Sequence, residues 1–199
     1  MRTYGIVLLI LVILFMVGAG AAAYFRRWPH KDVREQLTLI AHDRFGWTAQ
    51  ALIFPLVFGL TAILFLLITQ TLAATGPRSL GLVAALLFGA ACCLWLPISI
   101  GRIRYWSTAV ALLAKHDVDR PVDINFGANT FWSHTICILL AIVLMSTALA
   151  WAGVLPWLGW LVALMTLAGL VADRWIWRDW PPFLNYLLLL ILAIGLILA

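Results

Sequence analysis

The stretch from residue 80 to residue 100 reads LGLVAALLFGAACCLWLPISI and contains no charged side chain. An α-helix rises about 1.5 Å per residue, so this run reaches roughly 30 Å, the thickness of the hydrocarbon core of a bilayer. An uncharged run of this length is typical of a membrane span and longer than most buried helices of soluble proteins need. We therefore expect residues 80–100 to form a transmembrane helix.

The rest of the chain repeats this pattern. Hydrophobic residues make up 65% of the 199 residues and charged residues only 11%, against about 45–50% and about 25% in a soluble domain. The segments between the apolar runs are too short to build a separate core. The sequence predicts one all-α membrane domain over residues 1–199, a polytopic bundle of about six transmembrane helices. The other five predicted spans are residues 4–25, 47–73, 131–151, 157–172 and 183–199.

One polar segment shows helical periodicity. Val33, Leu37 and Ile40 recur at helical spacing between the first two spans. Such a pattern predicts a short amphipathic helix lying at the headgroup level, and a second interfacial helix is possible after residue 100. The first span, 4–25, is expected to remain uncleaved, because cleavage would place the cations that follow it outside the cell.

The cations are unevenly distributed along the chain. All 13 Lys and Arg residues except Arg2 and Arg78 lie in the segments 26–46, 101–130 and 173–182. Because Lys and Arg accumulate in cytoplasmic loops, these three segments are predicted to be cytoplasmic and both termini to lie outside. The expected location is the cytoplasmic (inner) membrane. Most of the 11 Trp residues, Trp47 among them, fall near predicted span ends, as in an aromatic belt.

Two features of the spans bear on helix packing. Pro55 removes one backbone donor, so a neighbouring helix is expected to pair the freed carbonyl, and both Pro55 and Pro97 are expected to kink their helices. Gly81, Ala85 and Gly89 repeat small side chains every four residues, which favours close helix–helix contact. The Gly76-Pro77 pair predicts a turn over residues 74–79 between two antiparallel spans.

Few polar side chains interrupt the spans as predicted, and none is Asp, Glu, Lys or Arg. This pattern disfavours proton relays and many ion-coupled transporters, which use intramembrane charges. The candidate cofactor- or ligand-binding residues are His134, Trp95, Gln50 and Gln70. His134 is able to ligate a haem or chlorophyll, or simply to bond a neighbouring backbone group, and Trp95 to stack on a ligand. The cofactor itself is unknown.

Two His-Asp pairs lie in segments predicted to share the cytoplasmic face. His42-Asp43 and His116-Asp117 together offer nitrogen and oxygen ligands for a divalent metal, or an acid–base set. Asp near a helix start is also an ordinary capping residue, and capping is the interpretation we favour. No catalytic residue is predicted.

These observations order the functional hypotheses. The leading one is a non-enzymatic accessory or scaffold subunit of a cytoplasmic-membrane complex, with membrane lipids and other membrane subunits as partners and no nucleic acid. The alternative is a binder or carrier of a hydrophobic small molecule or lipid, which predicts a cavity lined by Trp95, Gln50, Gln70 or His134. The second alternative is a membrane enzyme that acts on lipid headgroups through the His-Asp pairs.

Overall fold

The part of the chain described by the computed structural model is residues 1–26, 32–115, 128–175 and 182–199, and it is all-helical. These ranges contain seven α-helices and no strand, which confirms the predicted helical bundle. The helices are α1 (Arg2–Arg26), α2 (Val33–His42), α3 (Arg44–Gln70), α4 (Thr75–Ala114), α5 (Ala128–Trp151), α6 (Leu158–Trp175) and α7 (Pro182–Leu198).

Six of these helices each contain most or all of one predicted span, and α2 lies within the predicted amphipathic segment. Within the described ranges, α1, α3, α4 and α5 are long and apolar enough to cross a membrane. Helices α6 and α7 contain shorter apolar stretches. The apolar helices identify a membrane-embedded chain.

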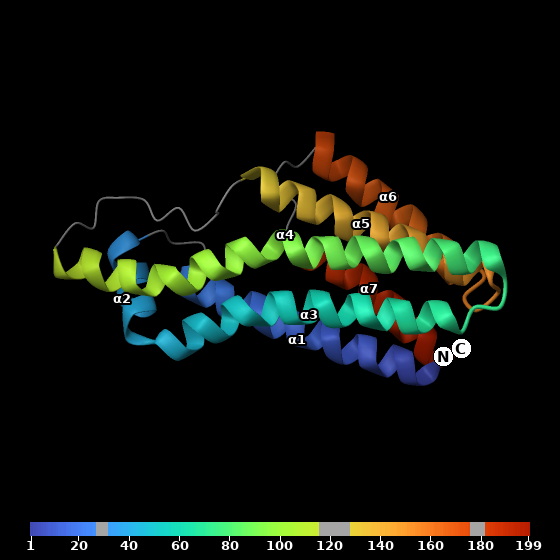
Figure 1. Ribbon diagram of the computed structural model, residues 1–199, viewed down its shortest axis with the longest axis horizontal. Helices are drawn as coiled ribbons and strands as arrows, with labels where there is room; N and C mark the ends of the chain where they lie inside the picture. The colour runs from blue at the N-terminus through green and yellow to red at the C-terminus, as the bar shows by residue number, and fades with distance from the viewer. Residues whose placement is uncertain (27–31, 116–127, 176–181) are drawn as a thin grey trace.

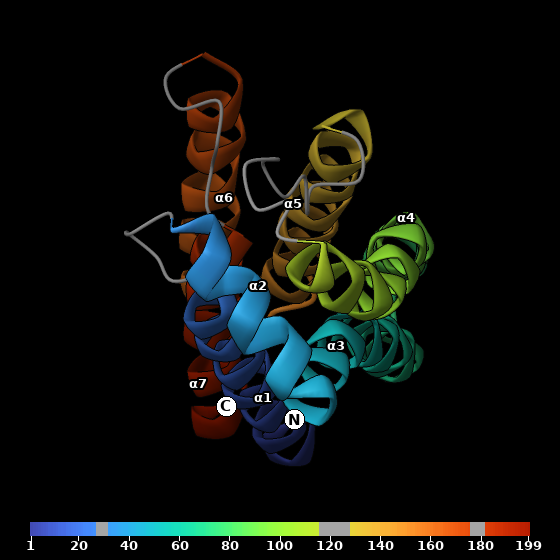
Figure 2. The same ribbon diagram turned by 90° about the vertical axis from the view of Figure 1, so that its left-hand side faces the viewer.

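The six apolar helices close into a ring. Neighbours in this ring are α1 and α3, α3 and α4, α4 and α5, α5 and α6, α6 and α7, and finally α7 and α1. Figure 2 shows this arrangement along the long axis of the molecule. Both termini lie at one end of the bundle, together with the turn between α3 and α4 (Figure 1). The opposite end has α2 and the far end of α4.

The turn between α3 and α4 is displaced from its predicted position. Helix α4 begins at Thr75, so Gly76 and Pro77 lie in its first turn and the connection is residues 71–74. The prediction that Gly76 and Pro77 lie in the turn itself was therefore wrong. Proline fits the first turn because the N–H groups there have no partner within the helix.

The link between α5 and α6 is a tight turn. Gly153 has φ 74°, in the left-handed region that glycine enters without steric cost. The N–H of Val154 donates to the carbonyl of Leu149 at 3.0 Å, and the N–H of Gly153 donates to that of Ala150 at 3.0 Å. These bonds pair the last carbonyls of α5 and turn the chain back towards α6.

Helix α4 is much longer than its predicted span. The span was predicted to end at residue 100, with a further helix possible after it, whereas residues 101–114 continue the same helix. A helix of 40 residues extends about 60 Å, roughly twice the hydrocarbon thickness. Its far end packs against α2, where Leu37 and Ile40 are buried with Phe25 and Ala109. The apolar face of α2 is therefore covered by protein.

Pro55 shows how α3 and α4 are joined. Proline has no N–H for the carbonyl of Ala51, four residues earlier in α3. The hydroxyl of Ser99 in α4 donates to that carbonyl at 2.8 Å, in a buried position. The thiol of Cys92 donates to the carbonyl of Pro55 at 3.3 Å. The expectation that a neighbouring helix would pair the carbonyl freed by Pro55 is confirmed.

We predict that Ser99→Ala lowers the free energy of unfolding by about 0.6–1.7 kcal/mol, the range for hydrogen bonds between membrane helices. The matched background is Pro55→Ala, which restores an N–H to the carbonyl of Ala51. Ser99→Ala should then cost less in this background than in the wild-type chain. A double-mutant cycle measured by unfolding in mixed micelles tests this, and equal losses in both backgrounds would contradict the pairing.

Candidate functional site

Aromatic side chains from five helices meet inside the ring, around Phe58 of α3. The Phe58 ring centroid lies 6.1 Å from that of Phe15, 5.6 Å from that of Trp95 and 6.1 Å from that of Tyr186. The imidazole of His134 is closer still, at 4.5 Å. Phe15 of α1 and Tyr186 of α7 stack on each other at 3.6 Å. We call these residues, together with Phe54 and Phe131, the aromatic core.

The sequence placed each of these helices in a span but gave no sign of which faces would meet. Phe58, Phe15 and Tyr186 are each 0–1% exposed, although nothing in the local sequence separates them from lipid-facing aromatic residues. Aromatic pairs at such distances add stability beyond the area they bury. The aromatic core therefore fills the space between the helices with side chains from the protein itself.

His134 lies fully buried in this core. Its Nδ1 is 2.8 Å from the carbonyl oxygen of Ala91 in α4. Because a carbonyl only accepts, Nδ1 donates, and Nε2 is left with a lone pair. The rings of Phe58 and Trp95 lie 4.5 Å and 4.6 Å from the imidazole, and Nε2 is buried. A porphyrin would have to displace these rings to reach Nε2. The bond to Ala91 matches the structural interpretation of His134.

Trp95 is a core residue and not the wall of an open cavity. It is 3% exposed and packs against the rings of Phe54 at 5.5 Å and Phe131 at 5.8 Å. Gln50 is 2% exposed and lies one helical turn before Phe54. Gln70 lies about 30 Å further along α3 and is exposed. The four predicted residues therefore do not line one cavity: His134 and Trp95 touch, Gln50 lies nearby, and Gln70 is separate.

Arg102 is the site residue that the sequence did not reveal. It was predicted to lie in a cytoplasmic loop, but it lies within α4 and is 4% exposed. Its guanidinium lies 5.3 Å from the Trp95 ring centroid and 5.8 Å from that of Phe54, which is cation–π geometry. Trp47, predicted to belong to the aromatic belt, is 1% exposed and donates from Nε1 to the Arg102 carbonyl at 2.5 Å.

A periodic signal in the sequence could have identified Arg102. The buried residues of α4 recur every three or four positions through Phe88, Ala91, Trp95 and Ile98, and Arg102 is the next member of this series. The presence of charge suggested that the span ended at residue 100. The helical period continued, however, and it kept the arginine on the buried face.

Several buried side-chain polar atoms have no hydrogen-bond partner among the described residues, and three of them are Gln50 Oε1, Trp95 Nε1 and His134 Nε2. They provide one donor and two acceptors beside the aromatic core. Such a set can hydrogen-bond a water molecule or a small polar group. The surrounding rings pack directly against Trp95 and His134, so a larger ligand would require the rings to move.

The first His-Asp pair has structural roles. The Asp43 carboxylate accepts from the Gly46 N–H at 2.7 Å and caps α3, as expected. Nδ1 of His42 donates to the carbonyl of Thr38 at 2.8 Å at the end of α2. His116 and Asp117 lie outside the described residues, so the predicted pairing stays a prediction. The described residues contain no group of three or more potential metal ligands.

We predict that the ring of His134 stabilises the fold more than its hydrogen bond does. His134→Ala should lower the free energy of unfolding by about 3 kcal/mol, as truncation of a buried ring does. His134→Phe keeps a ring and should cost about 1 kcal/mol, the value of one hydrogen bond. Unfolding in mixed micelles measures both. Equal losses of unfolding free energy in His134→Ala and His134→Phe would contradict this structural role. So would a porphyrin absorption band in the wild-type chain that His134→Phe abolishes.

Comparison with known proteins adds no further guide to the site. No family model matches the sequence. No curated protein and no solved structure matches it either. The function is therefore argued from the geometry of this chain.

Proposed function

We propose that the chain is a non-enzymatic subunit of a complex in the cytoplasmic membrane, where its bundle associates with another membrane protein. The filled interior supports this proposal. Trp95 and His134, the residues best suited to bind a cofactor, pack against each other with their ring centroids 4.6 Å apart. A bundle whose centre is occupied by its own side chains has its outer faces available for binding.

The proposal includes six crossings of the membrane, with the basic end of the bundle in the cytoplasm. An even number of crossings agrees with the two termini lying at one end (Figure 1). Among the described residues, Arg34, Arg44, Arg104 and Lys115 belong to the opposite end, the end of α2 and of the far part of α4. This distribution follows the tendency of cations to remain on the cytoplasmic side.

The observation that carries the proposal is the outer face of α4. A Cβ added at Gly89 would meet nothing within 4 Å, so open space lies beside it. Cys93 and Pro97 follow at four-residue intervals, and both are exposed. Leu86 and Ile100, 65% and 49% exposed, stand before and after this row. The small side chains at Gly89 and Cys93 would let the backbone of a second membrane helix approach this face closely.

Three other helical glycines already serve contacts inside the bundle, whereas Gly20 of α1, like Gly89, faces open space. A Cβ at Gly81 would collide with Thr69 of α3, and one at Gly18 with Ile53. A Cβ at Gly159 would meet the backbone of Ser146. A four-residue repeat drifts by about 40° per step around a helix of 3.6 residues per turn, which explains why Gly81 faces α3 while Gly89 faces outward. Gly89 is thus available to a partner.

A binder of a small hydrophobic molecule is the second candidate function. The specific observation in its favour is the set of unpartnered polar atoms on Gln50, Trp95 and His134. Binding of a small molecule at these atoms requires the aromatic core to open, because the imidazole of His134 lies 4.5 Å from Phe58 and 4.6 Å from Trp95. The enzyme hypothesis depends on His116, which lies outside the described residues, and we do not propose it.

The test uses p-benzoylphenylalanine in place of Leu86, which points a photo-crosslinker away from the bundle beside Gly89. Irradiation of native membranes should give an adduct heavier than the single chain, with a second copy or another subunit as the partner. Gly89→Leu places a bulky side chain on this face and should reduce the adduct severalfold. Gly20→Leu is the matched control, because Gly20 of α1 also faces open space.

Two results would contradict the proposal. One is the absence of any protein adduct at Leu86 under conditions in which the probe attaches to lipid. The other is an adduct whose yield falls equally in Gly89→Leu and in Gly20→Leu, since a general loss of folding would then explain it. The melting temperature of each purified variant separates these effects.

A further inference from the structure

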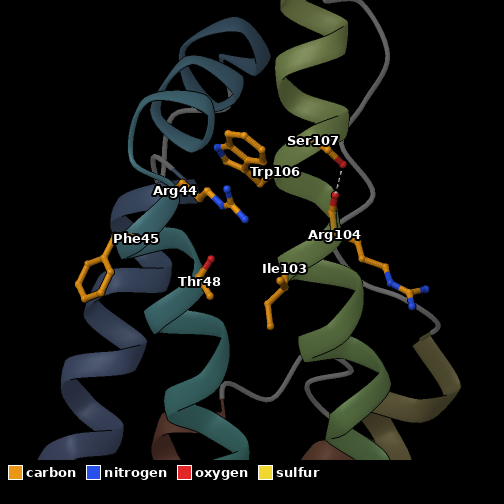
Figure 3. A pocket seen from close by; sticks show the side chains of 7 residues that line it. All are labelled: Arg44, Phe45, Thr48, Ile103, Arg104, Trp106 and Ser107. Carbon is orange, nitrogen blue, oxygen red and sulfur yellow. Dashed lines mark hydrogen bonds between the residues drawn. The ribbon is translucent and has the colours of Figure 1, made fainter.

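A groove of about 600 Å³ opens between the beginning of α3 and the part of α4 that continues beyond the predicted span. Figure 3 shows its walls: Arg44 and Thr48 belong to α3, and Ile103 and Trp106 belong to α4. Arg104 lines the rim and points away from Arg44 (Figure 3). The groove lies outside the aromatic core and at some distance from the Gly89 face.

The side chain of Arg44 is held in place by its neighbours. Its guanidinium carbon lies 4.6 Å from the ring centroid of Trp106. The indole is itself fixed, because Nε1 of Trp106 donates to the carbonyl of Ala41 at 3.2 Å. A stacked guanidinium keeps its charge and its in-plane N–H donors, which suit two oxygens of one phosphate. The groove therefore has a positioned cation with donors to offer.

The positive charge of the groove comes from Arg44, with Arg104 at the rim, and not from the end of a helix. The carboxylate of Asp43 already accepts from the N–H of Gly46, so the first turn of α3 is capped by the protein. An anion in the groove would therefore meet Arg44 first. The remaining wall is partly apolar, with Ile103 and the Trp106 ring, which suits a ligand with both a charged and a hydrocarbon part.

The level of the groove in the bilayer indicates which anion is available there. Leu80 begins the apolar run of α4, and Arg104 lies about 36 Å further along the helix. This distance passes the hydrocarbon core of about 30 Å and ends within the headgroup region of the bilayer. Phe45, beside the groove, is 85% exposed and points away from the groove (Figure 3). An uncovered aromatic ring at this level is typical of contact with the interfacial part of the lipid.

From this placement we infer that the groove is a binding site for an anionic phospholipid of the cytoplasmic leaflet. The guanidinium of Arg44 hydrogen-bonds the phosphate, and the hydroxyl of Thr48 faces the headgroup. Ile103 and the Trp106 ring contact the glycerol and the first carbons of an acyl chain. The inference goes beyond the proposed subunit role, because it needs no protein partner.

The test is a titration of the purified full-length chain in mild detergent, followed by native mass spectrometry. The probes are phosphatidylglycerol, phosphatidylcholine with the same acyl chains, and inorganic phosphate as a competitor. The wild-type chain should retain phosphatidylglycerol in preference to phosphatidylcholine. Arg44→Gln should weaken the binding of phosphatidylglycerol about tenfold, because one charge-assisted contact is lost. Arg34→Gln removes an exposed cation of α2 outside the groove and should have little effect.

A second variant separates loss of the groove from loss of folding. Thr48→Ile keeps every charge but fills the groove, and it should also abolish the preference for phosphatidylglycerol while the melting temperature stays near that of the wild type. Three results would overturn the inference. The first is an equal loss of phosphatidylglycerol binding in Arg44→Gln and Arg34→Gln. The second is that the wild-type chain binds both lipids equally well. The third is that millimolar inorganic phosphate displaces the bound lipid. The last would identify a site for free phosphate.

Discussion

Inside a bilayer, a polar group without a hydrogen-bond partner in the protein has no water to bond instead, and this constraint organises the contacts between α3, α4 and α5. The hydroxyl of Ser99 donates to the carbonyl of Ala51, which Pro55 leaves without a donor. The indole of Trp47 donates to the carbonyl of Arg102, and the imidazole of His134 donates to that of Ala91. Each bond runs from a side chain of one helix to the backbone of the next. Together they fix the depth of each helix relative to its neighbours.

This fixed register explains why the interior is filled. It brings Phe58, Trp95 and His134 to the same depth, where their rings pack together, and it places Arg102 directly above Trp95 and Phe54. A guanidinium on an aromatic surface is a low-cost way to bury a charge near the edge of the hydrocarbon region. The hydrogen bonds between these helices therefore serve assembly of the bundle, and we propose that the outer face of α4 and the groove at the basic end serve its function.

The sequence predicted the features that depend on local patterns. Uncharged runs such as residues 80–100 predicted the apolar helices, and the spacing of Val33, Leu37 and Ile40 predicted α2. It also predicted that the carbonyl freed by Pro55 would be paired. Features set by several helices together were missed. The position of Arg102 depends on a helix that continues past its apolar run, and the meeting of Phe15, Phe58 and Tyr186 depends on three helix orientations at once. Sequence spacing within one helix contains no information on such orientations.

The position of the bundle in the membrane is the central claim, because both the helix-binding face at Gly89 and the groove at Arg44 depend on it. It is tested most directly by labelling single cysteines in intact cells with a membrane-impermeant maleimide. Ala74→Cys lies in the exposed turn after α3 and Lys115→Cys at the exposed end of α4, each in a chain with its three native cysteines replaced by alanine. The account predicts labelling of Ala74→Cys from outside and of Lys115→Cys only after the cells are permeabilised. Labelling of both sites from outside, or of Lys115→Cys alone, would contradict it.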